Sequence, residues 1–418
     1  MSDIKNMSRR EFIGTAGAVG LSIGLMNSGF PSIKPNYTPS ELIRVGVIGT
    51  GSRGCRLIRS FVNTAKNVKI TAVCDVLSAH LAAGKELSGA SAKEYTDYKK
   101  LLEQKDLDCV IIATPPYLHA EMSIAAMDAG KDVFCEKTLA YSIEQCKAIV
   151  NKVKETKKIF QVGHQRRYNP VYTRTMEMIK EGVIGKVTTI RSQWHRNGNW
   201  RRPCPDPSLE RMINWRMYRE YSCGLMGELG SHQVDVANWV LGKRPIKVAG
   251  FGGINYWKDG RETYDNVHLV YEYPDGVRML YSSITTNAHF GCSEQIMGDE
   301  GTIILTEQGG EFFKEEIARK APEATAFGTD RTHELQKFIL ITGATIKPED
   351  PSTQEAKKIA MEKVDPTSIQ MLSFFECIRE NKEPACNAEV GRDASVAIHM
   401  GIRAMRKSEI VYWEPSFT

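Results

Sequence analysis

The 418-residue sequence predicts an α/β protein in which a doubly wound parallel sheet is followed by an α+β domain with a large, mostly antiparallel sheet. Three observations predict this fold class. Short apolar runs alternate with amphipathic helical segments up to about residue 163, as in right-handed βαβ units. A glycine-rich turn joins the first apolar run to the first helix. After residue 165, longer alternating segments are separated by turns such as Pro274-Asp275-Gly276.

The first forty residues have a different character and are left out of the fold. Ser8-Arg9-Arg10-Glu11-Phe12-Ile13 precedes a weakly apolar stretch from Gly14 to Met26, and together they resemble a twin-arginine export signal. An ordinary secretory signal or a membrane anchor is the alternative. Pro31 to Ser40 forms a polar linker. We expect export of the folded protein to the periplasm, with no stable membrane span afterwards.

The first domain is predicted over residues 41–163. Its buried strands are expected at Ile43–Ile48, Val68–Cys74, Asp108–Thr114, Lys131–Cys135 and Phe160–Gly163. Its helices are expected at Cys55–Asn63, Ser78–Ser88, Tyr117–Ala129 and Ile143–Thr156. Strands followed in turn by helices are typical of a parallel sheet covered on both faces.

The second domain is predicted over residues 164–418. Alternating strands are expected at Lys186–His195, Ile246–Asn255, Val267–Tyr273, Val277–Ile284 and Thr302–Leu305. A long helix is expected from Leu225 to Leu241, ended by Gly242, and a last helical region from Pro366 to Met405. Helices covering one face of an antiparallel sheet would explain this pattern.

Composition excludes several classes of function. The net charge of +5 is spread along the chain without a basic block, which argues against nucleic-acid binding. The ten cysteines include no Cys-x-x-Cys pair, so no metal site is predicted. The hydrophobic and charged fractions, 42% and 25%, are those of ordinary globular proteins.

The glycine turn predicts dinucleotide binding by a Rossmann-type domain. Gly49, Gly51 and Gly54, with Ser52 and Arg53 between them, form G-x-G-x-x-G after a strand and before a helix. Such a turn lets a diphosphate approach the backbone at a helix N-terminus. Asp75 ends the next strand, where a carboxylate binds ribose hydroxyls and repels a 2′-phosphate. NAD is therefore favoured over NADP; a plain glycine turn is the alternative.

Three further motifs carry a family resemblance. They are Ala113-Thr114-Pro115-Pro116-Tyr117-Leu118-His119, Cys135-Glu136-Lys137-Thr138 and the segment from Gly224 to Asp235. With the glycine turn, they resemble the glucose–fructose oxidoreductase / inositol dehydrogenase (Gfo/Idh/MocA) family over about residues 42–415. The resemblance implies that Thr114, Pro115 and His119 lie beside the cofactor, although His119 fits a structural role at a helix start equally well.

The resemblance also implies a catalytic lysine. Lys137 matches the residue that lies beside the nicotinamide and binds or polarises the reacting hydroxyl, with Glu136 orienting it. An ammonium group near an alcohol stabilises a developing alkoxide. A solvated lysine at a strand end is the alternative. Thr138 stands where the family usually has proline, often after a cis peptide bond, which leaves this local geometry open.

An acid and a histidine four residues apart complete the predicted catalytic set. Glu228 and His232 match family positions and fall on one face of a helix. His232 would remove the hydroxyl proton, and Glu228 would orient it or couple to its charge. The family more often has aspartate at the position of Glu228. The alternative is a core histidine, because His232 shares its stripe with Val236 and Trp239.

Two segments are predicted to complete the cofactor and sugar sites. After the fifth strand, the resemblance places Gln165 and Arg167 near the cofactor and His164 and Tyr168 near the substrate. The aromatic and basic segment that follows contributes candidate sugar contacts at Trp194, His195, Arg196, Trp200 and Arg201. A loop packed against a second subunit could have the same composition. Family members commonly pair, so a homo-oligomer, a dimer or a tetramer, is expected.

Three functions are consistent with these residues. The first is an NAD(P)-dependent oxidoreductase that transfers a hydride from a hydroxyl-bearing carbon of a sugar, polyol or glycoside. The second is a redox-neutral glycosidase with retained NAD, and the third is a non-catalytic sugar-binding protein. The periplasm is not expected to supply free nicotinamide cofactor. An exported enzyme is therefore expected to bind NAD tightly and to act on a small-molecule carbohydrate.

Overall fold

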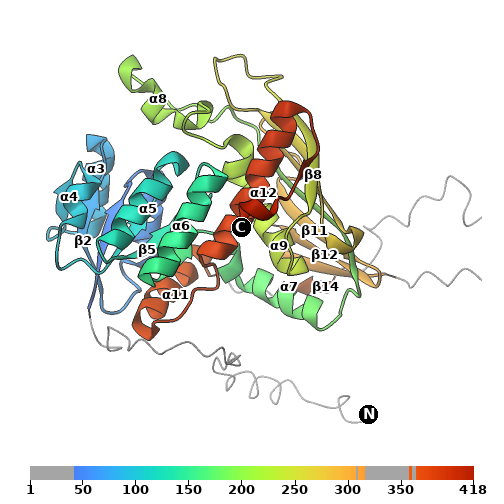
Figure 1. Cartoon of the computed structure of the whole chain (residues 1–418), viewed down its shortest axis with the longest axis horizontal. Helices are drawn as coiled ribbons and strands as arrows, with labels where there is room; N and C mark the ends of the chain where they lie inside the picture. Colours follow the sequence, from blue (N-terminus) through green and yellow to red (C-terminus); the bar gives the residue numbers. More distant parts are fainter. Residues whose placement is uncertain (1–41, 307–308, 316–356, 360–363) are drawn as a thin grey trace, which may run out of the picture. The chain divides into compact units, whose positions relative to one another are not determined.

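The structure is a computed structural model that describes residues 42–306, 309–315, 357–359 and 364–418. The predicted export signal and linker, residues 1–40, lie outside the described residues. All described residues belong to the same packed unit of the chain. They form two β-sheets with covering helices (Figure 1).

The first sheet is parallel and has the strand order β3-β2-β1-β4-β5-β6. Its strands are β1 (Ile43–Ile48), β2 (Val68–Cys74), β3 (Lys93–Tyr95), β4 (Cys109–Ile112), β5 (Asp132–Cys135) and β6 (Phe160–Val162). The direction of succession reverses between β1 and β4. In open parallel sheets, ligands bind at this point, beyond the carboxyl ends of the strands.

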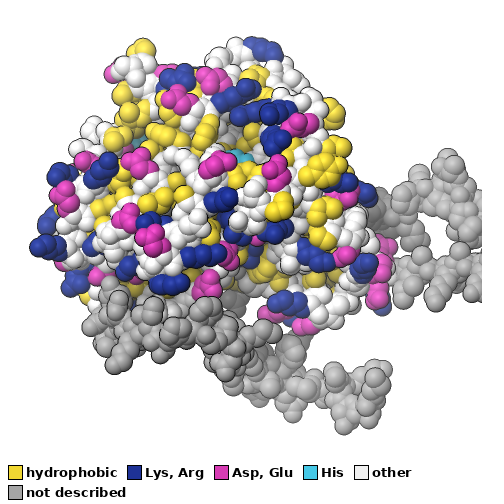
Figure 2. Space-filling view, in the orientation of Figure 1, with side chains coloured by type: hydrophobic (Ala, Val, Ile, Leu, Met, Phe, Trp, Pro, Cys, Tyr) yellow, Lys and Arg dark blue, Asp and Glu magenta, His cyan; other side chains and the backbone are white. Residues whose placement is uncertain are grey.

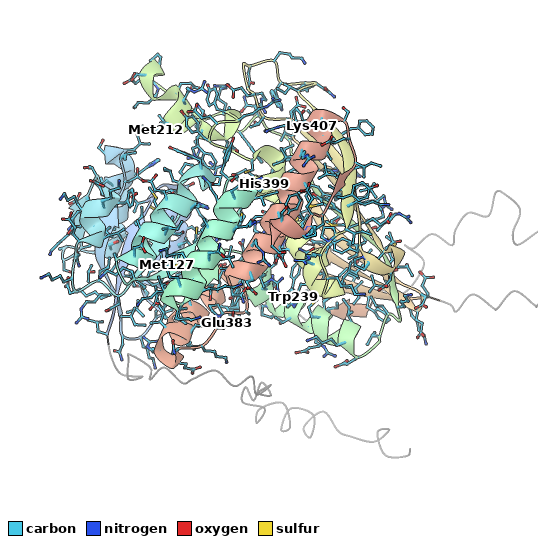
Figure 3. All side chains as sticks on the ribbon, viewed as in Figure 1. Met127, Met212, Trp239, Glu383, His399 and Lys407 are labelled. Carbon is cyan, nitrogen blue, oxygen red and sulfur yellow. The ribbon has the colours of Figure 1, made fainter. Side chains whose placement is uncertain are left out.

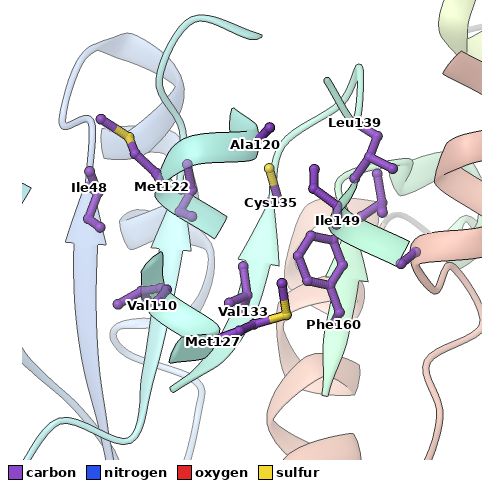
Figure 4. Close-up of a cluster of buried hydrophobic side chains, with 14 of the residues drawn as sticks. Ile48, Val110, Ala120, Met122, Met127, Val133, Cys135, Leu139, Ile149 and Phe160 are labelled. Atoms are coloured by element: carbon purple, nitrogen blue, oxygen red, sulfur yellow. The ribbon is translucent and has the colours of Figure 1, made fainter. Parts of the chain in front are cut away.

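Helices cover both faces of the first sheet, as predicted. One face carries α4 (Tyr98–Leu102), α5 (His119–Asp128) and α6 (Ile143–Thr156); the other carries α2 (Ser52–Phe61), α3 (Ser78–Ser88) and α11 (Pro366–Glu380). Figure 4 shows the first of these cores, where Val110 and Val133 of the strands meet Met127 of α5. Successive strand residues alternate between the two cores, Val47 in one and Ile48 in the other.

Helix α11 belongs to the predicted second domain but packs on the first sheet. Its Phe374 and Phe375 are fully buried. Phe375 lies 5.1 Å, ring centre to ring centre, from Phe61 of α2, and Phe374 lies 5.8 Å from Phe134 of β5. The core between the first sheet and α2, α3 and α11 is therefore completed by a segment from near the C-terminus.

The second sheet is mostly antiparallel, as predicted, with one parallel pair between β7 and β10. Its order is β14-β13-β12-β11-β7-β10-β9-β8-β15. The strands are β7 (Val187–His195), β8 (Lys247–Gly253), β9 (Asn266–Glu272), β10 (Arg278–Ile284), β11 (Cys292–Gly298), β12 (Gly301–Thr306), β13 (Gly309–Lys314), β14 (Lys357–Ile359) and β15 (Val411–Tyr412).

One face of this sheet is covered and the other is open. Helices α7 (Pro170–Lys180), α9 (Ser231–Leu241) and α12 (Ala388–Lys407) pack on the covered face. Figure 3 labels Trp239 on α9 and His399 on α12. Helix α12 also contacts α6 of the first domain. On the open face Phe251 is 79% exposed.

The structure differs from the predicted elements at several places. The helix expected over Leu225–Leu241 is a wide turn at Met226–Gly230 followed by α9, and Gly242 ends it in the left-handed conformation as predicted. The region Pro366–Met405 is two helices, α11 and α12. Strands β3, β11, β13 and β14 and helices α4 and α7 were not predicted, because they are short or carry polar residues.

Surface and composition add three observations. Figure 2 shows Lys and Arg interspersed with Asp and Glu over the visible face of the described part. No helix in this part is long and apolar enough to cross a membrane. None of the ten cysteines is in a disulfide bond, and nine of them are buried.

Candidate active site

The turn between β1 and α2 uses its three glycines for different reasons. Gly49 has a φ of +87°, a left-handed conformation that favours glycine. A Cβ on Gly54 would stand 1.9 Å from the carbonyl oxygen of Gly49, so only glycine lets the helix pack here. A Cβ on Gly51 would have His80 as its nearest neighbour, at 3.4 Å. Gly51 therefore keeps open the space at the helix N-terminus that a diphosphate needs.

A cleft of about 1680 Å³ extends from this turn, and we name it the cofactor cleft. The predicted cofactor residues that line it are Gly49, Gly51, Ser52, Arg53, Asp75, Thr114 and Pro115. The Asp75 carboxylate accepts hydrogen bonds from the backbone N–H groups of Thr50, at 2.8 Å, and Leu77, at 2.9 Å. An open glycine turn beside a fixed carboxylate fits a nicotinamide dinucleotide.

Lys137 follows β5 and reaches toward the second domain. Its Nζ donates to the carbonyl oxygen of Glu228 at 2.9 Å. Burial lowers the pKa of Lys137, although the carboxylates of Glu228 and Glu136 oppose that change. The peptide bond between Lys137 and Thr138 is cis. The Thr138 hydroxyl donates to the carbonyl oxygen of Gly227 at 3.0 Å, which brings the two segments together.

Glu228 is held by an arginine that the sequence did not single out. Arg216 Nε donates to the Glu228 carboxylate at 2.7 Å. Burial acts to raise the pKa of Glu228, but the positive charges of Arg216 and Lys137 outweigh it and hold the pKa below its usual value. Glu228 is therefore ionised at neutral pH and balances part of the positive charge around it.

His232 lies on α9 among aromatic rings. Its ring centre is 5.7 Å from that of Trp194 and 5.9 Å from that of His164. Burial, together with the positive charges of Lys137 and Arg166, lowers the pKa of His232 well below its usual value. Its Nδ1 has no hydrogen-bond partner among the described residues. The imidazole is therefore neutral at neutral pH and can accept a proton.

Lys137, Glu228 and His232 line one cleft of about 680 Å³, which we name the reaction cleft. The other predicted residues in its wall are Arg53, Thr114, Glu136 and Gln165. Arg53 and Thr114 also line the cofactor cleft, so the two clefts share a wall. The structure thus brings the predicted catalytic residues together beside the predicted cofactor residues.

Several predicted residues lie behind these clefts. His119 is fully buried, and its ring nitrogens are each 2.9 Å from a carbonyl oxygen, those of Thr114 and Thr138. His119 therefore ties together the loops that follow β4 and β5 and lines neither cleft. His164 lines neither cleft, and its ring centre lies 5.9 Å from that of His232.

Arg167 and Tyr168 point into the protein interior. The Arg167 guanidinium makes a two-pronged ion pair with the Asp235 carboxylate, with nitrogen–oxygen distances of 2.9 to 3.0 Å. The Tyr168 ring belongs to the core of the first domain. The structure brings neither side chain into the cofactor cleft or the reaction cleft.

The side chains of the aromatic and basic segment that begins at the end of β7 lie in three different places. Trp194 contacts His232, and Arg196 lies over the rings of Trp194 and Trp200, at 5.1 and 5.7 Å from their centres. His195 contacts Ser282 of β10, which lies on the open sheet face. Arg201 pairs with Glu210 and Asp259. Within this segment, Trp194 alone contacts a reaction-cleft residue through a ring.

Sequence reasoning missed the part of the second domain that closes the site. Trp215 and Arg216 line both clefts, and Leu209 and Met212 line the cofactor cleft. These residues lie between the predicted sugar segment and the helix that carries His232, and they match no motif. Their signal in the sequence is a local abundance of arginine and tryptophan.

Comparisons with known proteins bear on both domains. A family model described as an oxidoreductase family with an NAD-binding Rossmann fold matches residues 43–164, and the C-terminal α/β domain of the same family matches residues 176–412. The inositol 2-dehydrogenase of Salmonella paratyphi B is 30% identical over 209 residues, 49% of this chain and 57% of that protein. The match thus spans little more than half of that relative.

Two further proteins are similar. The 2,7-anhydro-N-acetylneuraminate hydratase of Escherichia coli is 34% identical over 212 residues, 51% of this chain and 53% of that protein. A solved levoglucosan dehydrogenase, in complex with NADH and levoglucosan, has a TM-score of 0.70 at 18% identity, covering 89% of this chain and 99% of that one. At that identity the likeness concerns the fold alone.

Proposed function

The chain belongs to the Gfo/Idh/MocA oxidoreductase family, and we propose that it oxidises a hydroxyl of a sugar, polyol or glycoside with a nicotinamide cofactor. One observation carries the proposal: Lys137, Glu228 and His232 meet in a cleft that shares a wall with the cofactor cleft. NAD is favoured over NADP because the Asp75 carboxylate would repel a 2′-phosphate.

The reaction needs a proton acceptor and a group that stabilises charge on oxygen. The bound nicotinamide supplies the acceptor for the hydride that leaves the hydroxyl-bearing carbon. Lys137 binds the hydroxyl oxygen and stabilises the negative charge that develops on it. His232, neutral at neutral pH, takes the hydroxyl proton. The ionised carboxylate of Glu228 holds Arg216, and the backbone carbonyl oxygen of Glu228 accepts from Lys137.

The test offers the protein a panel of sugars, polyols and glycosides together with NAD. Oxidation is measured as the formation of NADH. We expect His232→Ala to lower turnover by about 10²- to 10⁴-fold while the fold is retained. His195→Ala is the matched control, because that histidine contacts the open sheet face instead of the cleft. Near-normal turnover in His232→Ala would remove the histidine from the mechanism. Failure of the unmodified protein to bind NADH would contradict the proposal as a whole.

A second candidate is a redox-neutral glycosidase, favoured by the similarity to a protein named as a hydratase. Transient oxidation acidifies a neighbouring C–H bond; loss of that proton breaks the glycosidic C–O bond, water adds, and the hydride returns. The net change is hydrolysis, with the cofactor restored. Aryl glycosides offered without added cofactor separate the two candidates. Release of the aglycone, with solvent deuterium beside the oxidised carbon, favours the second; net NADH accumulation on free sugar with NAD supplied favours the first.

We also propose that the protein is exported and retains its cofactor. The paired Arg9 and Arg10 support a twin-arginine route, which carries folded proteins, to the periplasm. Protein isolated from the periplasm of a host cell should then release NAD on denaturation. Export that persists after replacement of both arginines by lysine would count against the route, and isolation without NAD would count against retention.

A homo-oligomer remains our proposal for the assembly. Val270 and Leu280 line a cavity on the open face of the second sheet, next to Phe251, and all three are exposed. Apolar surface of this kind is typical of a subunit interface. Light scattering on the purified protein should give a dimer or tetramer mass, and Phe251→Asp should lower that mass.

A further inference from the structure

A segment of the second domain forms part of the cofactor cleft. We define the clasp as residues 202–217, which include the short helix α8 (Glu210–Ile213). Arg202, Met212 and Trp215 of the clasp line the same cleft as the glycine turn and Asp75 of the first domain. Figure 3 labels Met212 on α8. The cofactor cleft therefore has walls from both domains.

The base of the clasp is fixed by Asn214, which is buried. Its Oδ1 accepts from the backbone N–H of Arg202 at 2.7 Å, and its Nδ2 donates to the Arg202 carbonyl oxygen at 3.0 Å. Nδ2 also donates to Glu210 at 2.9 Å. Because both backbone groups of Arg202 are held, its side chain projects from a defined point.

Arg202 differs from the other arginines that line this cleft. Arg53 pairs with Glu136 and Arg216 pairs with Glu228, both at 2.7 Å. Within the described ranges, Arg202 has no carboxylate partner; its Nη2 donates to the hydroxyl of Ser52, in the glycine turn, at 3.3 Å. Burial and the positive charge of Arg216 lower its pKa. An anion bound at the turn would neutralise this guanidinium.

Two apolar side chains mark a second part of the same cleft. Val76, which follows Asp75, is 67% exposed, and Met212 of the clasp is 46% exposed. Both line the cofactor cleft, one from each domain. In a dinucleotide bound with its diphosphate at the turn and its ribose on Asp75, the adenine falls next to Val76. A flat purine between these side chains would remove both from water.

We infer that the clasp closes over the adenosine diphosphate half of the cofactor, with Arg202 binding the diphosphate and Met212 covering the adenine. This inference rests on the proposed function. It assigns cofactor retention to the second domain, so the cofactor leaves only when the clasp moves away from the first domain. Retention then depends on residues outside the glycine turn.

The experiment compares Arg202→Gln with Arg56→Gln in the full-length protein. Arg56 lies on α2 outside both clefts and is largely exposed, so the control removes the same charge nearby. The affinities for NADH, ADP-ribose and adenosine are measured by calorimetry, and NADH release by stopped-flow fluorescence. We expect Arg202→Gln to lower the affinities for NADH and ADP-ribose by about 10- to 100-fold and to speed NADH release. The affinity for adenosine should not change.

The outcomes separate the inference from the proposed function. If Arg202→Gln binds and releases NADH like the unmodified protein, the clasp assignment is wrong while cofactor binding stands. If the unmodified protein, freed of any resident cofactor, binds neither NADH nor ADP-ribose, both proposals fail. Met212→Asp tests the adenine half separately. It should lower the affinity for adenosine as well as the affinity for NADH. An unchanged affinity for adenosine would show that Met212 does not cover the adenine.

Discussion

Two lysines with lowered pKa values, the buried Lys131 and the half-buried Lys137, differ in where they lie. Lys131 Nζ donates to the carbonyl oxygens of Leu107, at 2.7 Å, and Gln104, at 3.2 Å, as Lys137 does to the second domain. Burial lowers the pKa of both lysines. They differ in position, because Lys137 lines the reaction cleft and Lys131 does not. A shifted pKa alone would not identify the catalytic residue.

This comparison gives a prediction for the pair. Lys137→Met should lower turnover by about 10²- to 10³-fold, because the charge that stabilises the developing alkoxide is lost. Lys131→Met should keep normal turnover and lower the free energy of unfolding, because buried carbonyl oxygens lose their donor. Steady-state kinetics and urea unfolding of both variants provide the measurement. Equal effects on turnover would show that Lys137 acts only through stability.

A half-buried histidine predicts how stability depends on pH. Burial lowers the pKa of His399, on α12, from 6.5 to about 4, against the hydrogen bond to the Ala140 carbonyl oxygen, which acts to raise it. Since the folded pKa lies below the unfolded one, protonation favours unfolding. The contribution of His399 to the free energy of unfolding is fully present above about pH 6.5 and is lost as the pH falls toward about 4.

We therefore expect acidification to lower the free energy of unfolding of the protein, and protonation of His399 to cause part of that loss. Between about pH 7.5 and pH 5, His399→Gln should lose about 2 kcal/mol less free energy of unfolding than the unmodified protein. His289→Gln, at an exposed position, is the control. Urea unfolding curves at the two pH values measure the effect. An identical pH dependence in the two variants would exclude His399 as its source.

The residues of the site were predictable from sequence only where they belong to motifs. Lys137, Glu228 and His232 were found because each stands in a motif at the end of a strand or the start of a helix. Met212 and Arg216 were missed because tertiary folding alone brings the clasp to the cleft. Arg167 was placed near the cofactor by its neighbours in sequence, yet its side chain turns toward Asp235.

At the scale of elements, the local pattern of apolar residues identified the helices and strands that bury an apolar face. Strand β11 was missed because it carries Glu294, which is fully buried and accepts from the Tyr172 hydroxyl at 2.7 Å and from Arg166. A carboxylate within a strand cannot be predicted to be a core residue until the residues that pair with it are known. Those partners lie more than a hundred residues earlier, so a local window could not have found them.

The turn between β1 and α2 predicts opposite effects for two glycines. Gly51→Ala should fold normally, because Gly51 has a φ of −65° and the new Cβ has space. It should nevertheless lower the affinity for NADH at least about tenfold, because the Cβ would fill the diphosphate position. Gly54→Ala should lower the free energy of unfolding by at least about 1–3 kcal/mol, because its Cβ would meet a backbone oxygen. Thermal unfolding and NADH titration separate the two outcomes, and normal NADH affinity in Gly51→Ala would contradict this reading of the turn.

At the scale of the whole molecule, the two halves of the sequence do not map simply onto the two sheets. The predicted boundary at residue 163 stands one residue after the end of β6. The return of α11 to the first sheet was not predicted, because nothing in an amphipathic helix says which sheet it covers. Phe374 and Phe375 would have suited either core.

The return of α11 predicts the behaviour of fragments. Residues 42–163 alone should lack cooperative thermal unfolding, because Phe61 and Phe134 lose their partners on α11. Joining residues 364–382 through a flexible linker should restore a cooperative transition. Near-ultraviolet circular dichroism of both fragments provides the measurement. A cooperative transition in residues 42–163 alone would mean that α11 is dispensable for this core.

The same helix sets an order of events in the cell. Helix α11 is synthesised about 200 residues after β6, the last strand of the sheet that it covers. At a translation rate of about 5–20 residues per second, the nascent first domain waits roughly 10–40 s with one face of its sheet only partly covered, by α2 and α3. During that interval its exposed phenylalanines are available to chaperones. The dinucleotide site can then reach its final form only after the ribosome has nearly finished the chain.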